Sequence, residues 1–231
     1  TPQFVKDAGA KGFMNKGKWS PYSDDPVFQK YYTKFVKALA KDFNDPSKVE
    51  FIDGFGLGKW GEYHTMIYST GDDTPKKAVF DWVTDIYSQA FDKVPVVINY
   101  HRWIGAGKDW VDDEHFAADS EEMLEGAIKK GYSLRHDAFG MTTYYGSWER
   151  RFAKKYRNIC PIIMEGGWIV KSHSYWQDPR GYRKDSHEDV RRGEFDDSKE
   201  AHVNMMDFRF GDTESWFKDA FDLVRRFLRE G

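Results

Sequence analysis

The chain has 231 residues, which is enough for one large domain or two small ones. Its formal net charge is -3, and no basic run alternates with aromatic residues, so a nucleic-acid partner is not expected. No apolar stretch approaches the ~20 residues that span a bilayer, so no membrane span is expected either.

Aromatic residues are abundant in a chain that is otherwise polar. Trp, Tyr and Phe make up 17% of the residues, and many of the Trp and Tyr residues fall in predicted loops. Rings in loops suit the flat apolar faces of sugars, although large proteins also use aromatic residues to seal the ends of barrels. The single cysteine, Cys160, excludes an internal disulfide framework. It falls in a predicted strand, which favours a buried and inert thiol.

The first half of the chain alternates helices with strands. Residues 1–24 lack periodicity and are expected to form a long loop with room for one short strand. Apolar residues then recur at helical spacing after Asp24 or Asp25, either of which can cap a helix with Pro26 in its first turn. The elements expected up to residue 100 are a helix over 26–42, a strand over 49–55, a helix over 75–91 capped by Thr74, and a strand over 96–100.

The second half continues the alternation. A long loop is expected over residues 103–119, followed by a helix that Ser120 caps and Gly131 ends. Long aromatic loops are expected after the third and fourth strands. The elements expected here are a helix over 121–130, a strand over 132–137, a helix over 147–156, a strand over 159–164 that ends in Glu165, a helix over 186–200, a strand over 203–208 and a helix over 213–229.

A helix followed by a strand, repeated five times, predicts an α/β fold with a parallel sheet. The candidate folds are a doubly wound sheet and a (β/α)8 TIM-type barrel. No Gly-x-Gly-x-x-Gly or phosphate-loop motif follows any strand, and the long aromatic loops favour the barrel. Five strands do not close an eight-stranded barrel. We therefore expect residues 1–231 to form a single catalytic barrel domain that lacks its first strands.

Two glutamates, Glu62 and Glu165, follow predicted strands. Parallel strands open toward one edge, so these carboxylates can converge. Cleavage of a glycosidic bond uses two carboxyl groups, ~5–5.5 Å apart in retaining enzymes and ~6.5–9.5 Å apart in inverting ones. Trp60 and Tyr63 are expected to exclude water and raise the pKa of Glu62, as a general acid requires. The alternatives are a glycine-rich turn with an incidental Glu62, and a strand-end salt bridge at Glu165.

Other polar and aromatic groups near the strand ends are candidate substrate contacts. For one of these groups, Arg135, the alternative is a structural ion pair with Asp137. The candidates are Trp60, His64, Tyr100, His101, Arg135, His136, Tyr144, Trp168 and Asp207.

A rival chemistry is a metal-dependent hydrolase. It would use a barrel-mouth cluster of His64, His101, His136 and Glu165, but no His-x-His or His-Glu-x-x-His spacing supports it. No Gly-x-Ser-x-Gly elbow suggests Ser/His/Asp catalysis. No metal or other cofactor is expected.

The stretch Gly58-Lys59-Trp60-Gly61-Glu62-Tyr63-His64-Thr65 resembles bacterial β-galactosidase-like (β/α)8-barrel domains related to the clan-A retaining glycoside hydrolases. The resemblance extends from about residue 30 to the C-terminus. It implies that Glu62 is the general acid/base after strand four and that Glu165 is the nucleophile at the end of strand seven. Most of that superfamily has Asn before the acid/base, where this chain has Gly61, so the contact to the sugar 2-hydroxyl must come from elsewhere.

The resemblance also implies a substrate and a location. The substrate would be an oligosaccharide or a polysaccharide, and the protein would be a secreted or periplasmic bacterial protein of polysaccharide degradation. The expected function is a retaining glycoside hydrolase. The alternatives are a non-catalytic carbohydrate-binding barrel and the metal-dependent hydrolase.

Overall fold

The computed structural model describes residues 1–108, 114–139, 145–166 and 187–207, together with Asp222, Arg225 and Arg229. For residues 187–192 and for Asp207 only the backbone is described. The fold is mixed α/β, with parallel strands in the order β3 (Ile52–Asp53), β4 (Val96–Asn99), β5 (Ser133–Phe139), β6 (Ile162–Gly166) and β7 (Met205–Asp207). The expected α/β class is therefore confirmed. No strand pairing among the described residues closes the sheet, so the eight-stranded barrel stays a prediction.

The chain divides into two compact units, which are described separately. The first consists of Thr1–Ile98 and Arg102–Tyr132, and the second consists of Asn99–His101 and Ser133–Gly231. The expectation of one barrel domain stays a prediction as well.

The N-terminal region of the first unit has more structure than the expected loop. It contains helix α1 (Gln3–Asp7) and an antiparallel hairpin of β1 (Gly12–Asn15) and β2 (Lys18–Pro21). Lys16 and Gly17 join the two strands, with φ angles of 47° and 77°. A two-residue turn with both φ angles positive matches the twist of a hairpin. Lys-Gly is a weaker turn signal than Asn-Gly, so the sequence did not predict it.

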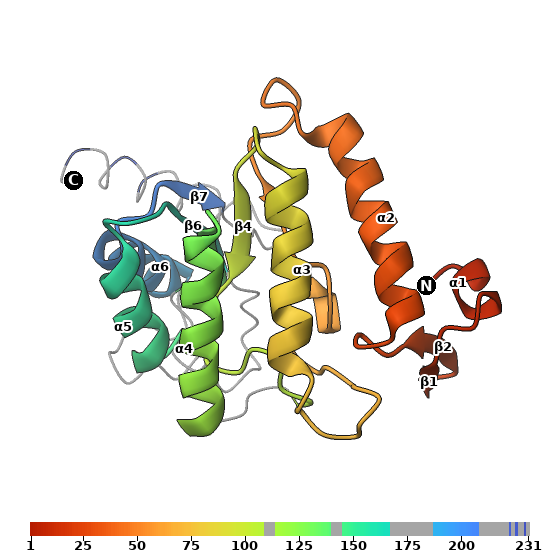
Figure 1. Cartoon of the computed structure of the whole chain (residues 1–231). Helices are drawn as coiled ribbons and strands as arrows, with labels where there is room; N and C mark the ends of the chain where they lie inside the picture. The colour runs from red at the N-terminus through yellow and green to blue at the C-terminus, as the bar shows by residue number, and fades with distance from the viewer. Residues whose placement is uncertain are drawn as a thin grey trace. The chain divides into compact units, whose positions relative to one another are not determined.

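Helices α2 (Pro26–Phe43) and α3 (Lys76–Ala90) lie side by side, close to the expected bounds (Figure 1). Asp25 is the cap of α2, because its Oδ1 accepts the Phe28 amide at 2.9 Å. Each helix contributes one tyrosine, Tyr32 from α2 and Tyr87 from α3, near the segment that follows β3. The Tyr32 hydroxyl donates to the Phe55 carbonyl at 3.0 Å and lies 3.1 Å from the Tyr87 hydroxyl. These bonds fix the chain where it leaves β3.

Strand β3 (Ile52–Asp53) is much shorter than the expected strand over 49–55, and it pairs in parallel with β4 (Val96–Asn99). Gly54 follows β3, and a Cβ atom added there would lie 2.0 Å from Val96 Cγ1. The Tyr132 hydroxyl donates to the Gly54 carbonyl at 2.9 Å. The chain thus turns where only glycine leaves room for the neighbouring strand and this tyrosine.

Helix α4 (Glu114–Lys129) begins well before the expected start at residue 121, so the expected loop over 103–119 is too long. Ser120 does not cap this helix. It is buried within it, and its Oγ accepts the Ile104 amide at 2.9 Å. The early turns of α4 bury polar side chains that have polar partners. The apolar periodicity that marks a helix is therefore missing there.

The second unit contains parallel strands β5 (Ser133–Phe139), β6 (Ile162–Gly166) and β7 (Met205–Asp207). Helices α5 (Ser147–Tyr156) and α6 (His187–Ala201) pack against each other, and α6 also contacts β5 and β6. These elements agree with the expected ones to within a few residues. The helix expected over 213–229 lies outside the described residues, apart from Asp222, Arg225 and Arg229.

Cys160 does not lie in a strand, contrary to the prediction. Its amide donates to the Tyr156 carbonyl at 3.1 Å, so it belongs to the turn after α5, and β6 begins later. The side chain is half-buried, and burial raises the thiol pKa to about 11. A thiol that stays protonated at neutral pH is a poor nucleophile.

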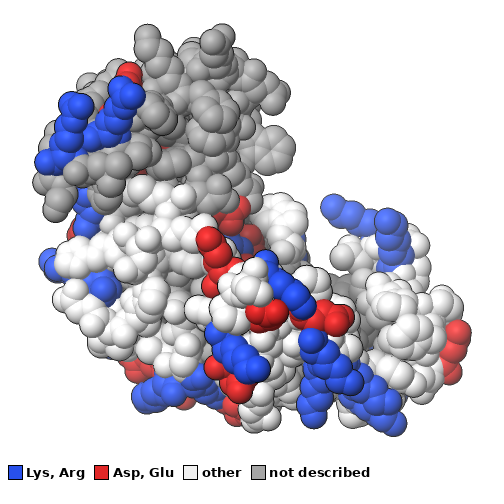
Figure 2. Space-filling model, turned by 90° about the horizontal axis from the view of Figure 1, so that it is seen from above, with Lys and Arg blue, Asp and Glu red and all other residues white. Residues whose placement is uncertain are grey.

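The surface gives two further facts. None of the described helices is both long enough and apolar enough to cross a lipid bilayer. On the face that Figure 2 shows, Lys and Arg side chains are interspersed with Asp and Glu side chains over the described residues.

Buried tyrosines predict a loss of stability at alkaline pH. Burial raises the pKa of Tyr63, Tyr100 and Tyr145 well above the ordinary value of 10.0. The unfolded chain releases these protons near pH 10 and the folded chain does not. The free energy of unfolding should therefore be fully retained below about pH 10 and fall as the pH rises above it. Denaturant titrations at about pH 8 and about pH 11 measure the effect, and equal values would contradict it.

Candidate functional site

Glu62 lies in the first unit, in the loop between β3 and α3, directly after the short helix η1 (Lys59–Gly61). The residue is only 8% exposed. Its Oε2 lies 3.2 Å from Nε2 of His64, which is also buried, and His64 Nδ1 lies 3.3 Å from the Thr65 hydroxyl. A shielded carboxylate in contact with an imidazole can hold a proton and pass it on. The general acid/base role of Glu62 stays a prediction.

The two aromatic neighbours of Glu62 behave differently. Trp60 is 71% exposed, with its ring 5.8 Å from the His64 ring and the Lys59 ammonium 4.1 Å from its centre. An exposed indole beside a polar pair suits a sugar ring. Tyr63 is fully buried, and its hydroxyl donates to the Lys76 carbonyl at 3.1 Å. Tyr63 therefore anchors the loop to the start of α3.

The loop that carries Glu62 has an unusual backbone. Non-glycine residues with positive φ each cost roughly 1–2 kcal/mol, and surrounding contacts must hold them in place. Here the Lys59 amide donates to the His64 carbonyl, and the Gly105 amide donates to the Tyr63 carbonyl at 2.7 Å. Such strain occurs often at functional sites. The positive φ angles belong to Gly56, Gly58, Trp60, Gly61, Tyr63 and Thr65.

The backbone at Gly61 has a conformation that favours glycine. Gly61 has a φ angle of 81°, and an added Cβ would lie 3.3 Å from Gly56 Cα. A side chain at this position meets both an unfavourable conformation and another backbone segment.

We therefore predict that Gly61→Ala lowers the free energy of unfolding by about 1–2 kcal/mol. The measurement is a denaturant titration. Gly126→Ala in α4 is the matched control, because a Cβ there meets nothing within 4 Å and alanine favours a helix. The control should be neutral or stabilising. A Gly61→Ala variant as stable as the wild type would contradict the claim that the backbone at Gly61 is strained.

Glu165 lies in the second unit, near the end of β6, and forms an ion pair with Arg135 of β5. Arg135 Nη1 lies 2.6 Å from Glu165 Oε2, and the Glu165 side chain is 20% exposed. This contact matches the alternative interpretation of Glu165 as a carboxylate in a strand-end salt bridge, and the ion pair of Arg135 with Asp137 stays a prediction. A short charge-assisted bond orients the Glu165 carboxylate.

The face that carries Arg135 holds more polar groups. Side chains alternate along a strand, so Asp137 shares the face of Arg135 and His136 lies on the opposite face. Asp137 Oδ1 lies 3.4 Å from Asn99 Nδ2 at the end of β4. Asn99 is 3% exposed, and its Oδ1 has no hydrogen-bond partner among the described residues. It is therefore an acceptor for a water molecule or a ligand hydroxyl. The backbone register also pairs Glu165 with Asp207 of β7.

Tyr100 and His136, two predicted substrate contacts, lie in a buried aromatic cluster. The Tyr100 ring is 5.0 Å from the His136 ring and 5.8 Å from Phe152 of α5. The Tyr100 hydroxyl lies 2.9 Å from that of Tyr145. His136 Nδ1 accepts the Ala138 amide at 3.0 Å, so the neutral ring carries its hydrogen on Nε2. These contacts favour a packing role for both residues.

A packing role predicts a stability effect. Tyr100→Phe leaves the buried Tyr145 hydroxyl without its partner, so the free energy of unfolding should fall by about 1–3 kcal/mol. The double variant Tyr100→Phe with Tyr145→Phe removes both hydroxyls and should recover part of that loss. Denaturant titration of the three proteins measures both effects. Strictly additive losses would show that the two hydroxyls do not interact.

The predicted residues divide between the two units. Trp60, Glu62 and His64 belong to the first, and Tyr100, His101, Arg135, His136 and Glu165 belong to the second. The convergence of Glu62 and Glu165 stays a prediction. Tyr144 and Trp168 lie outside the described residues, and Asp207 is described by its backbone alone. His101 is buried at 2% exposure. Within the described part of the chain, no group of three or more His, Cys, Asp or Glu side chains is placed to hold a metal ion.

Sequence reasoning missed two features of these sites. The first is the pairing of Arg135 with Glu165, which depends on the register between β5 and β6. The second is Lys76, which a helical pattern assigns to the surface but which is only 3% exposed. Its partner Asp119 comes from a different helix, and no local signal in the sequence marks that contact.

Comparison of the chain with protein-family models, with curated proteins and with solved structures gives no match. The functional assignment therefore depends on the residues and their geometry.

Proposed function

We propose that this protein is a glycoside hydrolase that cleaves a glycosidic bond with retention, using two carboxylates. One observation carries the proposal. Glu165 lies near the carboxyl end of parallel strand β6, Glu62 lies in the loop that follows β3, and each has a basic partner: His64 for Glu62 and Arg135 for Glu165. Active sites of parallel α/β proteins lie at that edge of the sheet.

The proposed reaction has two steps. In the first, Glu165 attacks the anomeric carbon while Glu62 donates a proton to the leaving oxygen, which gives a covalent glycosyl-enzyme. In the second, Glu62 takes a proton from water as the water displaces Glu165 from the sugar.

The neighbours of the two glutamates fit these roles. Arg135 binds Oε2 of Glu165 and so fixes which oxygen faces the sugar. His64 contacts the carboxyl group that loses and regains a proton. Trp60 offers an exposed ring for the substrate, and Asn99 offers a buried acceptor for a sugar hydroxyl.

The experiment is turnover of a panel of 4-nitrophenyl α- and β-glycosides of galactose, glucose, mannose and xylose. Proton NMR of the first product formed identifies its anomer. Turnover with retention supports the proposal. Turnover with inversion would require a different mechanism, and absence of turnover across the panel would count against a hydrolase.

The second candidate function is carbohydrate binding without catalysis. It is favoured by the observation that both glutamates contact a basic side chain, at 3.2 Å and 2.6 Å, because such contacts also occur in purely structural roles. Binding of a glycan by a protein that hydrolyses none of the panel would select this function.

A further inference from the structure

The first unit contains a pocket that the proposed catalytic groups do not occupy. Its volume is about 490 Å³, within the range of small-molecule sites. The walls come from the loop between β3 and α3, from the loop after β4 and from the start of α4. Apolar side chains form one part of the lining and charged side chains form the rest. Among them are Met66, Tyr68, Asp72, Asp73, Lys108 and Phe116.

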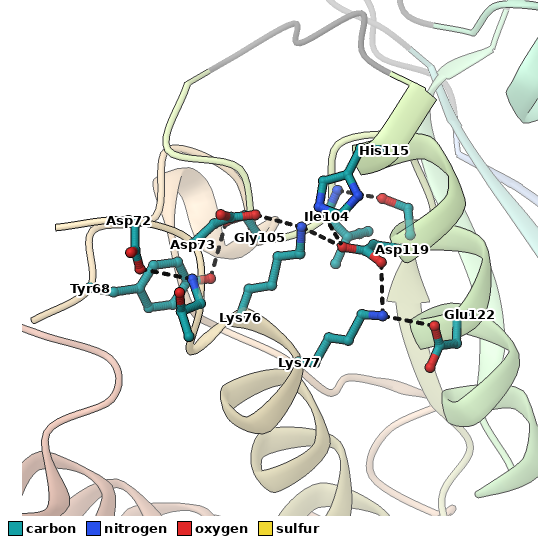
Figure 3. A network of polar contacts seen from close by, with 12 residues as sticks. Tyr68, Asp72, Asp73, Lys76, Lys77, Ile104, Gly105, His115, Asp119 and Glu122 are labelled. Carbon is teal, nitrogen blue, oxygen red and sulfur yellow. Dashed lines mark hydrogen bonds and ion pairs between the residues drawn. The ribbon is translucent and has the colours of Figure 1, made fainter. Parts of the chain in front are cut away.

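Lys76, just behind the pocket, connects two of these walls (Figure 3). Its ammonium lies 2.6 Å from Asp73 Oδ2 in the loop and 2.6 Å from Asp119 Oδ2 in α4. It also lies 4.1 Å from the centre of the Phe116 ring. The Lys76 side chain is 4% exposed, so these contacts are shielded from water. One buried cation thus positions both a carboxylate and an aromatic ring of the pocket.

Further bonds fix the third wall, which is the loop after β4. The Tyr68 hydroxyl donates to the Gly105 carbonyl at 3.1 Å (Figure 3), and the Met66 amide donates to the Ala106 carbonyl at 2.9 Å. Asp119 is held in turn by Lys77 at 2.8 Å and by His115 at 3.4 Å. Because the walls are bonded to one another, the pocket exists before any ligand arrives. A preformed site loses little conformational entropy on binding.

The pocket is surrounded by charges of both signs. Lys76 and Lys77 are paired with Asp73, Asp119 and Glu122. Asp72 and Asp73 are the acidic groups of the lining, and Lys108 is its basic group. The carboxylates would repel a strongly anionic ligand, and the lysine would repel a strongly cationic one. A neutral ligand with many hydroxyls can donate to the carboxylates, accept from the lysine and place an apolar face on Phe116.

The pocket is also close in sequence to the proposed acid/base. Met66 follows His64 by two residues, and Tyr63 is bonded to the Lys76 carbonyl. Both loops that form the pocket follow the carboxyl ends of parallel strands, β3 and β4.

We propose that this pocket is a subsite for one sugar unit, with Asp72 accepting from sugar hydroxyls and Phe116 supporting the ring. Lys76 is a positioning residue that holds Phe116 and Asp73 in place. The inference rests on the proposed function, because it takes the ligand to be part of the glycan that the two glutamates process.

The test measures binding of free galactose, glucose, mannose and xylose to the wild-type chain, by saturation-transfer NMR and titration. Free monosaccharides are not cleaved, so binding is read independently of hydrolysis. We expect Phe116→Ala to weaken binding of the preferred sugar about tenfold, and Phe116→Trp to restore most of it. Asp72→Asn keeps the shape of the side chain and should weaken binding about fivefold.

Phe35→Ala is the matched control, because Phe35 is a 54% exposed phenylalanine on α2 outside the pocket lining. Thermal unfolding verifies that each variant is folded. If Phe116→Ala does not fold, the binding measured for Asp72→Asn decides the test. Binding equal to wild type in both pocket variants overturns the inference, as does absence of binding by all four sugars.

The two proposals fail in different ways. If the protein turns over the aryl glycosides and both pocket variants bind sugar as the wild type does, the subsite proposal fails and the hydrolase proposal stands. If the protein turns over no glycoside but the pocket variants weaken sugar binding, the subsite proposal stands and the hydrolase proposal fails.

Discussion

Replacement of Glu165 by Gln is expected to lower kcat on an aryl glycoside by roughly 10⁴-fold or more, because it removes the group that attacks the sugar carbon. The amide has nearly the same shape as the carboxylate, and it can still accept a hydrogen bond from Arg135. The fold and the affinity for glycans should therefore be retained. Initial rates measure kcat, and calorimetric titration with a glycan measures binding.

Glu200→Gln is the matched control for this variant. Glu200 is an exposed glutamate at the end of α6 in the same unit, so its replacement makes the same chemical change away from the site. The control should have wild-type rates. A Glu165→Gln protein that retains even a tenth of wild-type activity would rule out Glu165 as the nucleophile.

Replacement of Glu62 by Gln should have an effect that depends on the leaving group. A general acid contributes about 10²–10⁴-fold to the rate, so substrates with a poor leaving group should lose that much. Substrates with a good leaving group, such as 2,4-dinitrophenyl glycosides, need little protonation and should retain their first step. The alkaline limb of the pH profile of kcat/KM should also disappear, since it reports the proton on Glu62.

Rates for a series of aryl glycosides with leaving groups of different pKa measure this dependence. Glu50→Gln is the control, because Glu50 is an exposed glutamate just before β3 in the same unit. A Glu62→Gln variant that slows good and poor leaving groups equally would contradict the acid/base role. That result would instead point to a structural role for the contact with His64.

The sequence predicted the α/β class and most elements, because helical periodicity and apolar strands are local signals. It was wrong where the structure depends on partners distant in the chain. The start of α4 was missed because Ser120 and Asp119 bury polar groups against partners from other segments. The shortness of β3 depends on Gly54, whose role is visible only once Val96 and Tyr132 are beside it.

The candidate site likewise has features that the sequence predicted and features that depend on distant parts of the chain. The sequence placed Glu62 and Glu165 beyond or at the ends of strands, and the structure agrees. Sequence alone did not reveal that Arg135 binds Glu165, or that Gly61 has a positive φ angle and lies against Gly56. It assigned Tyr100 and His136 to the substrate because they follow strands, yet their contacts lie in an aromatic cluster with Tyr145. Strand register and loop conformation decide these points, and neither has a local signature.

Covalent labelling tests the central claim most directly. The wild-type protein is incubated with the 2-deoxy-2-fluoroglycosyl fluoride of the sugar that it cleaves fastest, and peptide mass spectrometry then locates the modification. We predict one fluorosugar per chain, attached to Glu165, with loss of activity in proportion to labelling. A label on any other residue, or turnover with retention and no label at all, would contradict the assignment of Glu165 as the nucleophile.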